Sequence, residues 1–162
     1  MVDIMKYPLR AAACLVIVAP IACTPANAIA DEGFWYLQGS VYTRHFGNNQ
    51  GYNNHQDLIG LERNLASGVI AGAATFRNSF SQRSWYAYAG KRFDLPESPI
   101  YFKLSAGLIH GYKGKYRDKL PLNQWGIAPA IIPGVGAHWG PVAGEVVLLG
   151  LAATMVNVGV RF

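Results

Sequence analysis

The chain ends with TMVNVGVRF, residues 154–162, and the alternation in this stretch decides the fold. Apolar residues or threonine occupy every second position, and mostly small or polar residues lie between them. The first set is Thr154, Val156, Val158, Val160 and Phe162, and the second is Met155, Asn157, Gly159 and Arg161. Because successive side chains of a β-strand point to opposite faces, this period of two predicts a strand with one apolar face.

The aromatic last residue strengthens this prediction. A chain that stops on Phe162 after such a strand resembles the assembly signal of outer-membrane barrels. The alternative is an ordinary half-buried final strand. After the N-terminal region there is no long apolar run, so no transmembrane helix is predicted. A membrane protein built from strands instead has to close into a barrel, because only closure pairs every backbone group within the bilayer.

Seven further segments are predicted to be strands, and the alternation is clearest between Pro99 and Gly111. They are Phe34 to Tyr42, Leu58 to Arg63, Gly68 to Phe76, Gln82 to Asp94, Pro99 to Gly111, Ile127 to His138 and Pro141 to Gly150. The expected fold is therefore all-β: an eight-stranded antiparallel transmembrane β-barrel of the outer membrane.

The connections between the predicted strands alternate in length. Asn64 to Ser67, Leu95 to Ser98 and Trp139 to Pro141 are short, whereas Thr43 to Asp57, Arg77 to Ser81 and Tyr112 to Gln124 are longer or more polar. Small outer-membrane barrels have short periplasmic turns and long external loops. The longer connections are therefore expected at the external end, where the residues with reactive side chains also gather.

The first 30 residues have the features of a secretory signal peptide. Lys6 and Arg10 precede an apolar run from Ala11 to Ala22, and two small-residue cleavage sites end at Ala28 and Ala30. Cleavage there leaves residues 31–162 as one domain and removes both cysteines, so no disulfide or thiolate site is expected. A buried helix and a lipidated Cys23 are the alternatives.

A net charge of +5 makes either nucleic acid or anionic lipid a conceivable partner, and export favours lipid. Lys113, Lys115 and Arg117 form a basic segment in the last long connection. If this segment faces outward, the phosphates of lipopolysaccharide are its natural partner. A solvated loop without a specific ligand is the alternative.

Histidine and serine residues of the external connections suggest base-assisted acyl transfer, because a hydroxyl needs an activating base. The candidates are His45, with His55 as a fallback, and the neighbouring pair Asn78 and Ser79. Asparagine can orient an imidazole or donate to an oxyanion. No metal-ligand spacing is present, so neither a metal nor another cofactor is predicted. Loop residues that are merely solvated are the alternative.

Two prolines, Pro129 and Pro133, lie within one predicted strand. Each removes a backbone donor, so the ladder to one neighbouring strand has to be broken there. The break predicts either a lateral opening for lipid or a simple bulge.

The residues PAIIPGVGAHWGPV, 129–142, resemble a stretch of the lipid A palmitoyltransferase family, with two prolines four apart followed by an aromatic-Gly-Pro-Val turn. FRNS, residues 76–79, is similar to that family's Phe-Lys-Asp-Ser loop, and WYAYAG, residues 85–90, follows its next strand. Residues 42–46 and 52–53 resemble its first external loop. The likeness covers most of the chain after residue 30.

The resemblance implies an eight-stranded outer-membrane barrel that moves a palmitoyl chain from a phospholipid to lipid A. It assigns the catalytic serine to Ser79 and the catalytic histidine to His45, and Asn78 stands where the family has aspartate. Gly90 matches the glycine at the floor of the acyl-chain pocket. The resemblance also implies an apolar upper interior around a narrow well.

Acyl transfer from a phospholipid to a lipid A hydroxyl is thus the leading functional hypothesis, with His45 as general base and Ser79 and Asn78 in supporting roles. The protein is expected to be an outer-membrane monomer without nucleic-acid partners. Alternatives are a lipid A deacylase and a non-catalytic barrel acting in membrane integrity or adhesion. A solute transporter is disfavoured, because side chains usually fill an eight-stranded lumen.

Overall fold

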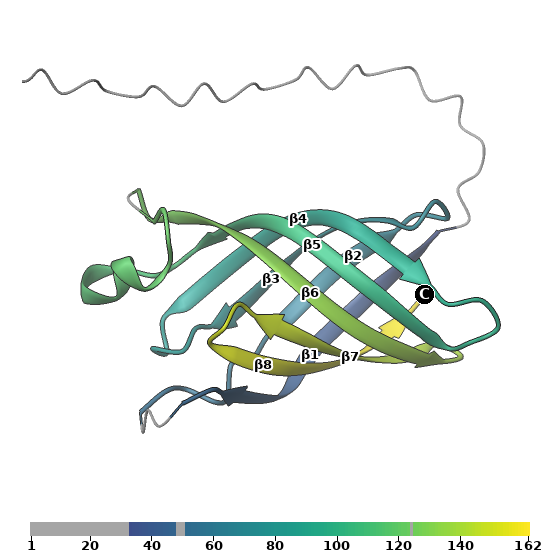
Figure 1. Ribbon diagram of the computed structural model, residues 1–162, viewed down its shortest axis with the longest axis horizontal. Coiled ribbons are helices and arrows are strands. Elements are labelled where there is room, and N and C mark those ends of the chain that lie inside the picture. Colours follow the sequence, from purple (N-terminus) through teal and green to yellow (C-terminus); the bar gives the residue numbers. More distant parts are fainter. Residues whose placement is uncertain (1–32, 48–50, 124) are drawn as a thin grey trace, which may run out of the picture.

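The computed structural model describes residues 33–47, 51–123 and 125–162, and these form a closed antiparallel barrel of eight strands (Figure 1). The strands are β1 (Phe34–His45), β2 (Ile59–Asn64), β3 (Val69–Arg77), β4 (Arg83–Asp94), β5 (Ile100–His110), β6 (Ile127–Trp139), β7 (Val142–Leu149) and β8 (Ala153–Arg161). Each strand pairs with the next in sequence, and β1 pairs with β8. The predicted eight-stranded barrel is confirmed. The predicted signal peptide lies outside the described residues.

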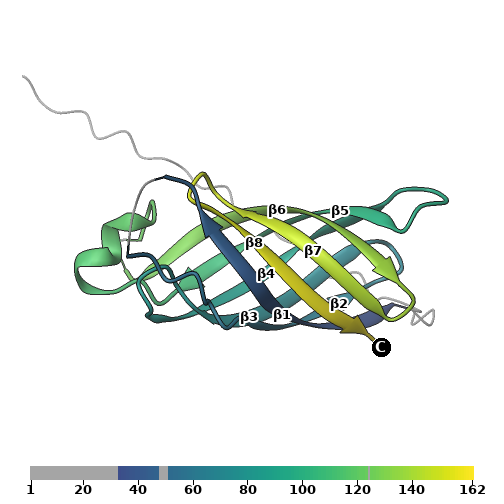
Figure 2. The same ribbon diagram turned by 90° about the horizontal axis from the view of Figure 1, so that it is seen from below.

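The barrel closes where β1 lies beside β8, which Figure 2 shows most directly. This ladder runs from Tyr36↔Arg161 to His45↔Ala153, with a register shift between Ser40 and Tyr42. The first strand is therefore three residues longer than the sequence predicted. As a result His45 belongs to the end of a strand, and the prediction that it lies in a loop was wrong.

Alternate residues face the interior and the exterior, and the large apolar side chains face outward. In β8, Met155 and Asn157 are buried, while Val158 and Val160 are exposed. Exposed aromatic residues lie near both ends of the strands: Trp35, Phe93, Phe102, Trp139 and Phe162 at the short-turn end, and Tyr42 and Trp85 at the opposite end. An apolar outer surface with aromatic rims is typical of barrels that sit in lipid.

The interior has two layers of different chemistry. The half near the short turns holds an ion-pair network in which Lys103 lies between Glu62 and Glu145. The half near the long connections holds an apolar cluster of Leu58, Ala74, Val147 and Met155, against which Phe76, Ile132 and Leu149 pack. The upper interior therefore holds an apolar cluster, and the predicted narrow well within it stays a prediction.

The connection between β5 and β6 contains a short 3-10 helix, η1 (Gly114–Lys119), which the sequence analysis expected to be loop. It lies at the end of the barrel opposite the C-terminus (Figure 1). Within the part of the chain that the structure describes, no helix is both long and apolar enough to cross a bilayer.

Candidate active site

His45 stands at the end of β1 where that strand has one neighbour only. Its ladder to β2 ends at Gly39↔Ile59, and the last main-chain bond between these segments runs from Ser40 N–H to Leu58 O. Beyond that point β1 pairs with β8 alone, as His45↔Ala153 shows. The half-buried imidazole is thus held by a paired strand while one side stays open to the first long connection.

Ser79 lies in the connection between β3 and β4, and the first long connection is hydrogen-bonded to it. Asn53 N–H donates to Ser79 O at 2.9 Å, and Asn53 Nδ2 donates to Asn78 O at 3.3 Å. Arg77 N–H also donates to Gln56 O. These contacts fix the serine relative to β1, although Ser79 lies 34 positions after His45 in the sequence.

The His45 ring joins a serine to an asparagine. Its Nε2 lies 2.7 Å from Ser79 Oγ, and its Nδ1 lies 2.8 Å from Asn54 Oδ1. A carbonyl oxygen can only accept, so Nδ1 carries the proton and Nε2 presents its lone pair to the serine hydroxyl. This tautomer is the one that can take a proton from Ser79. We call His45, Ser79 and Asn54 the triad.

Asn54 was not predicted from the sequence, and the orienting role was expected of Asn78. The Asn78 side chain is fully buried and bonds within its own turn, accepting from Phe80 N–H at 2.9 Å and Gln82 N–H at 3.1 Å. Its amide donates to Ser84 Oγ at 3.1 Å. Asn78 therefore shapes the turn that presents Ser79. Nothing in the spacing of the polar first connection singles out Asn54 from its neighbours.

An aromatic cluster packs against His45 of the triad and joins all three long connections. Tyr52 packs against the His45 ring with centroids 4.7 Å apart, and Phe80 packs against Tyr52 at 5.6 Å. Tyr116 stacks on Phe80 at 3.9 Å. Because these rings come from different connections, they hold the loops together around the serine and reduce its exposure to water.

Tyr112 lies on another side of the serine. Its phenol is within hydrogen-bonding reach of Ser79, and its ring makes an edge contact with Phe80 at 6.2 Å between centroids. Burial raises the pKa of Tyr112, and the contact with Ser79 lowers it by less. The phenol therefore stays protonated at neutral pH and can donate a hydrogen bond beside Ser79.

An open hollow of about 300 Å³ adjoins the triad. His45, Asn54 and the fallback candidate His55 line it, together with Val41, Tyr42, Thr43, Arg44, Gly47 and Tyr52. His55 is exposed, and its main-chain N–H donates to Asn53 Oδ1. The structure thus brings His45 to Ser79, and it leaves His55 at the rim of the hollow.

The three basic candidates, Lys113, Lys115 and Arg117, lie at the same end of the barrel as Ser79. Lys113 N–H donates to Gln82 Oε1 at 3.0 Å, which ties its connection to the turn after Ser79. Arg117 Nε donates to Asn123 O, and Lys115 lies over the Tyr116 ring. All three side chains are exposed, so their charges can meet an anionic surface.

Pro129 and Pro133 lie in a half-paired part of β6. That strand pairs with β5 along residues 127–137, whereas its ladder to β7 starts only at Gly134↔Val147. His138 N–H donates to Pro99 O on the β5 side, so the odd-numbered residues of β6 face β7. Both prolines therefore lack a donor where no partner strand is present. We call this unpaired stretch between β6 and β7 the seam.

Gly90, in β4, faces the interior of the barrel, and the packing there leaves no room for a side chain. A Cβ built there would collide with the Leu104 carbonyl oxygen and would lie 2.8 Å from Ser105 Cα, both in the adjacent strand β5. The close approach of two backbones thus requires glycine. A role for Gly90 at the floor of an acyl-chain well stays a prediction.

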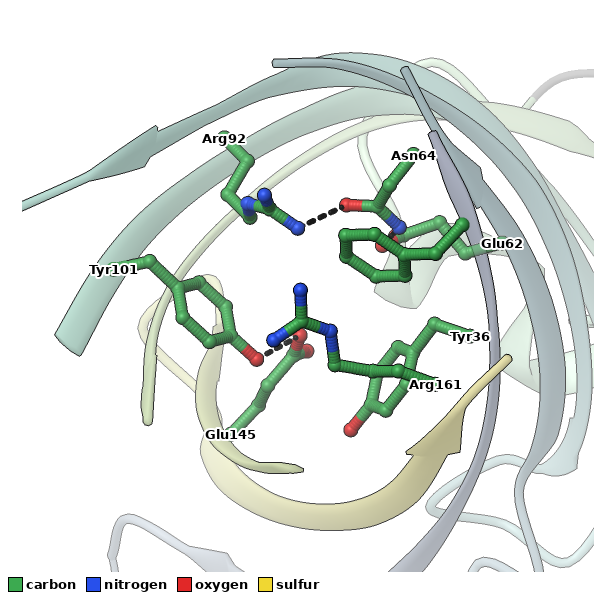
Figure 3. A pocket seen from close by; sticks show the side chains of 8 residues that line it. Tyr36, Glu62, Asn64, Arg92, Tyr101, Glu145 and Arg161 are labelled. Carbon is green, nitrogen blue, oxygen red and sulfur yellow. Dashed lines mark hydrogen bonds between the residues drawn. The ribbon is translucent and has the colours of Figure 1, made fainter. Parts of the chain in front are cut away.

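A second hollow, of about 10 Å³, lies inside the barrel at the short-turn end (Figure 3). Arg161 reaches into it between Tyr36 and Tyr101, and Arg92 Nη1 donates to Asn64 Oδ1. Its volume is about that of one water molecule, and it lies at the opposite end from the triad.

Within the described ranges, no group of three or more His, Cys, Asp or Glu side chains is placed to hold a metal ion.

No protein-family model matches this chain, and no curated protein matches it. Among solved structures, the backbone structure of the Yersinia pestis outer membrane protein Ail in a phospholipid bilayer nanodisc matches it. The match covers 81% of this chain and 100% of the Ail chain, at 18% identity and a TM-score of 0.44. Function therefore has to be argued from the residues of this chain.

Proposed function

We propose that the barrel resides in the outer membrane, with the triad at its external face. The outward-facing apolar side chains and the aromatic residues at both ends of the strands support insertion into a bilayer. The orientation follows from the connections, because the long ones, including η1, share one end and barrels of this kind direct long loops outward.

Within that setting, the proposed activity is transfer of a palmitoyl chain from a phospholipid to a lipid A hydroxyl. The observation that carries this proposal is the 2.7 Å contact between His45 Nε2 and Ser79 Oγ, with Nδ1 fixed by Asn54. An imidazole held in this tautomer acts as the general base for acyl transfer. The resemblance of residues 76–79 and 129–142 to lipid A palmitoyltransferases supplies the substrate class.

The charge at the external end supports an anionic acceptor. Lys115 and Arg117 are exposed on η1, close in the chain to Tyr116, which stacks on Phe80 next to Ser79. Each basic side chain near an anionic lipid surface contributes about 1 kcal/mol to binding. The phosphates of lipid A would therefore be held on the side where the triad opens. No cofactor is required, since the acyl donor is already an ester.

The seam supports lateral access of lipid from the membrane. An open sheet edge in hydrocarbon leaves its N–H groups without partners, which costs several kcal/mol for each group. Pro129 and Pro133 remove two of these donors from the side of β6 that faces the seam. The break in the ladder is thus tolerated in lipid, and a substrate chain can approach the upper interior through it.

Mass spectrometry of lipid A tests the proposal directly. Lipid A from cells that express the protein should gain one palmitoyl mass over lipid A from cells that lack it, and His45→Ala should lose the gain. His110→Ala is a matched control, because His110 is exposed at the same end and its Nδ1 is hydrogen-bonded to Gly126 O. If lipid A still gains the palmitoyl mass in His45→Ala, the role of general base passes to His55. Unchanged lipid A under every envelope stress tested would exclude the activity.

A non-catalytic barrel is the second candidate, and the packing of the interior favours it. Met155, Val147 and Leu58 fill the upper lumen, and the stacked rings of Tyr86 and Tyr88 lie below them. A filled lumen suits a rigid scaffold that displays loops for adhesion or supports the membrane. This candidate requires that His45→Ala and Ser79→Ala leave lipid A unchanged while any binding function persists.

A further inference from the structure

We propose that acyl transfer proceeds through a covalent ester on Ser79, with Asn54 as the positioning residue of His45. This inference rests on the acyl-transfer part of the proposed function and answers which hydroxyl attacks the donor first. Two routes are possible in principle: the acceptor hydroxyl attacks the donor directly, or Ser79 attacks first and the acceptor follows. The geometry of the triad distinguishes them.

The lone pair of the base is already engaged. His45 Nε2 lies 2.7 Å from Ser79 Oγ, the usual length of a strong hydrogen bond between a hydroxyl and its acceptor. Any other hydroxyl would first have to displace Ser79 from this nitrogen. The proton that Nε2 is placed to receive therefore belongs to Ser79, which is the arrangement of an activated nucleophile.

Both partners of this hydrogen bond are held in place. The imidazole is fixed on its far side by Asn54 Oδ1 at 2.8 Å and by the Tyr52 ring. The serine main chain is fixed through the bond from Asn53 N–H to Ser79 O. A nucleophile, a base and an orienting amide in series make up the constellation that serves covalent acyl transfer on unrelated folds.

The first chemical step forms an acyl ester on Ser79. Ser79 Oγ adds to the ester carbonyl carbon of the donor as its proton moves to His45 Nε2. The tetrahedral intermediate collapses, the bond from carbon to the glycerol oxygen breaks, and that oxygen takes the proton from Nε2 and leaves as an alcohol. The products are a lysophospholipid and an acyl ester on Ser79, with no redox change.

The second step reverses the roles. The acceptor hydroxyl gives its proton to Nε2 and adds to the acyl carbonyl carbon. The bond from that carbon to Ser79 Oγ breaks, and the serine oxygen takes the proton back. Because a water molecule can replace the acceptor in this step, the same site would also hydrolyse simple esters slowly when no lipid acceptor is present.

A biotinylated alkyl fluorophosphonate tests the nucleophile with the full-length protein in membranes. Attack by Ser79 forms an oxygen–phosphorus bond and expels fluoride, and peptide mass spectrometry locates the adduct. We expect one adduct per chain, on Ser79, with labelling at least about 100-fold slower in His45→Ala. Ser81→Ala is the matched control, because Ser81 is an exposed serine of the same turn.

The role of Asn54 has its own readout. Asn54→Ala should slow labelling about tenfold or more, because Nδ1–H loses the acceptor that fixes the tautomer. Asn54→Asp keeps an acceptor oxygen and should restore the rate. Its carboxylate also stabilises the imidazolium, so the acid limb of its pH–rate profile should move to higher pH. A merely structural role for Asn54 predicts no such displacement.

Ser79→Ala should abolish the adduct, and Ser79→Cys covers the case in which Ser79→Ala does not fold. The described residues contain no cysteine, so labelling within them should pass in Ser79→Cys from the fluorophosphonate to iodoacetamide, at position 79 alone. An adduct elsewhere in the chain, or none on a folded barrel, overturns the covalent route.

Labelling does not depend on lipid A, so its outcome is separable from the lipid A measurement. An adduct on Ser79 together with unmodified lipid A supports Ser79 as the nucleophile and excludes lipid A as the acceptor. Palmitoylated lipid A that persists in Ser79→Ala overturns the covalent route and leaves the proposed function in place, with the acceptor attacking directly.

Discussion

Lys103 Nζ lies 2.6 Å from Glu145 Oε2 inside the barrel, and the same ammonium lies 3.2 Å from Glu62 Oε2. One cation therefore serves two carboxylates, which also accept from tyrosine hydroxyls: Tyr88 donates to Glu62 at 2.8 Å, and Tyr101 donates to Glu145 at 2.9 Å. All three ionised side chains are buried, so water contributes little to their solvation. The network has to satisfy their charges itself.

Replacing Lys103 by methionine should destabilise the barrel by about 3–5 kcal/mol, because two buried carboxylates lose their common cation. Denaturant unfolding of the protein in lipid vesicles measures the effect. The combined variant Lys103→Met, Glu62→Gln, Glu145→Gln should recover part of the loss. Lys91→Met, at an exposed position of β4, is the control. Equal stability of Lys103→Met and Lys91→Met would contradict the role assigned to the network.

Tyr112→Phe should lower acyl transfer roughly tenfold or more, by removing a donor beside Ser79 where negative charge develops. Burial raises the pKa of this phenol above its ordinary value of 10.0, so the hydroxyl keeps its proton at both pH 7 and pH 9. The ratio of wild-type to variant rates should therefore be the same at pH 7 and pH 9. A ratio that collapses by pH 9 would mean that the phenol ionises there and is not the donor.

Two variants of Asn78 distinguish a structural role of this residue from a catalytic one. Asn78→Ala strands the Phe80 and Gln82 N–H groups and should cost about 1–3 kcal/mol for each donor left buried without a partner. Transfer activity should fall with it, because the turn that presents Ser79 loosens. Asn78→Asp retains an acceptor oxygen for both the Phe80 and the Gln82 N–H groups, and Ser84 can donate to the new carboxylate, so most of the activity should remain. Kinetics on folded protein decide the matter. Loss of activity in Asn78→Asp without loss of stability would contradict this assignment.

The strands were predictable because a barrel wall imposes a simple rule on sequence. Alternation places Val158 and Val160 on the outer face and Asn157 on the lumen side. Each strand pairs with the next one in sequence, so the order of the strands in the barrel follows from their order in the chain. The end of β1 escaped prediction, since Tyr42 to His45 pair only with β8, at the other end of the chain. No local pattern reports on such a partner.

The site was predicted in part, and the reason for the difference is physical. His45 and Ser79 were chosen by residue type and by the resemblance, and the structure brings them into contact. Asn54 was missed because its role depends on how the first connection folds over the second. That packing is set by the Tyr52 ring against His45 and by the bond from Asn53 N–H to Ser79 O, which joins two different connections of the barrel.

The seam begins at Pro133, just beyond the last residue pair of the ladder between β6 and β7. Residues 133 and 148 face each other one step beyond the final pair, Gly134↔Val147. Arg161 N–H donates to Pro141 O on the β8 side, so the even-numbered residues of β7, including Leu148, face β6. Proline at position 133 has no N–H, and one of the two hydrogen bonds that this step would form is therefore impossible.

Pro133→Ala restores that donor, and we expect the ladder between β6 and β7 to extend by one step. Ala at 133 would donate to Leu148 O and accept from Leu148 N–H, so hydrogen exchange of the Leu148 amide, followed by NMR, should slow. Closing the seam should also reduce transfer from a donor in vesicles more than from a donor dispersed in detergent, because only the former enters laterally. Pro96→Ala, in the exposed turn between β4 and β5, should change neither quantity. Unaltered exchange at Leu148 would mean that side chains, and not the missing N–H group, hold the seam apart.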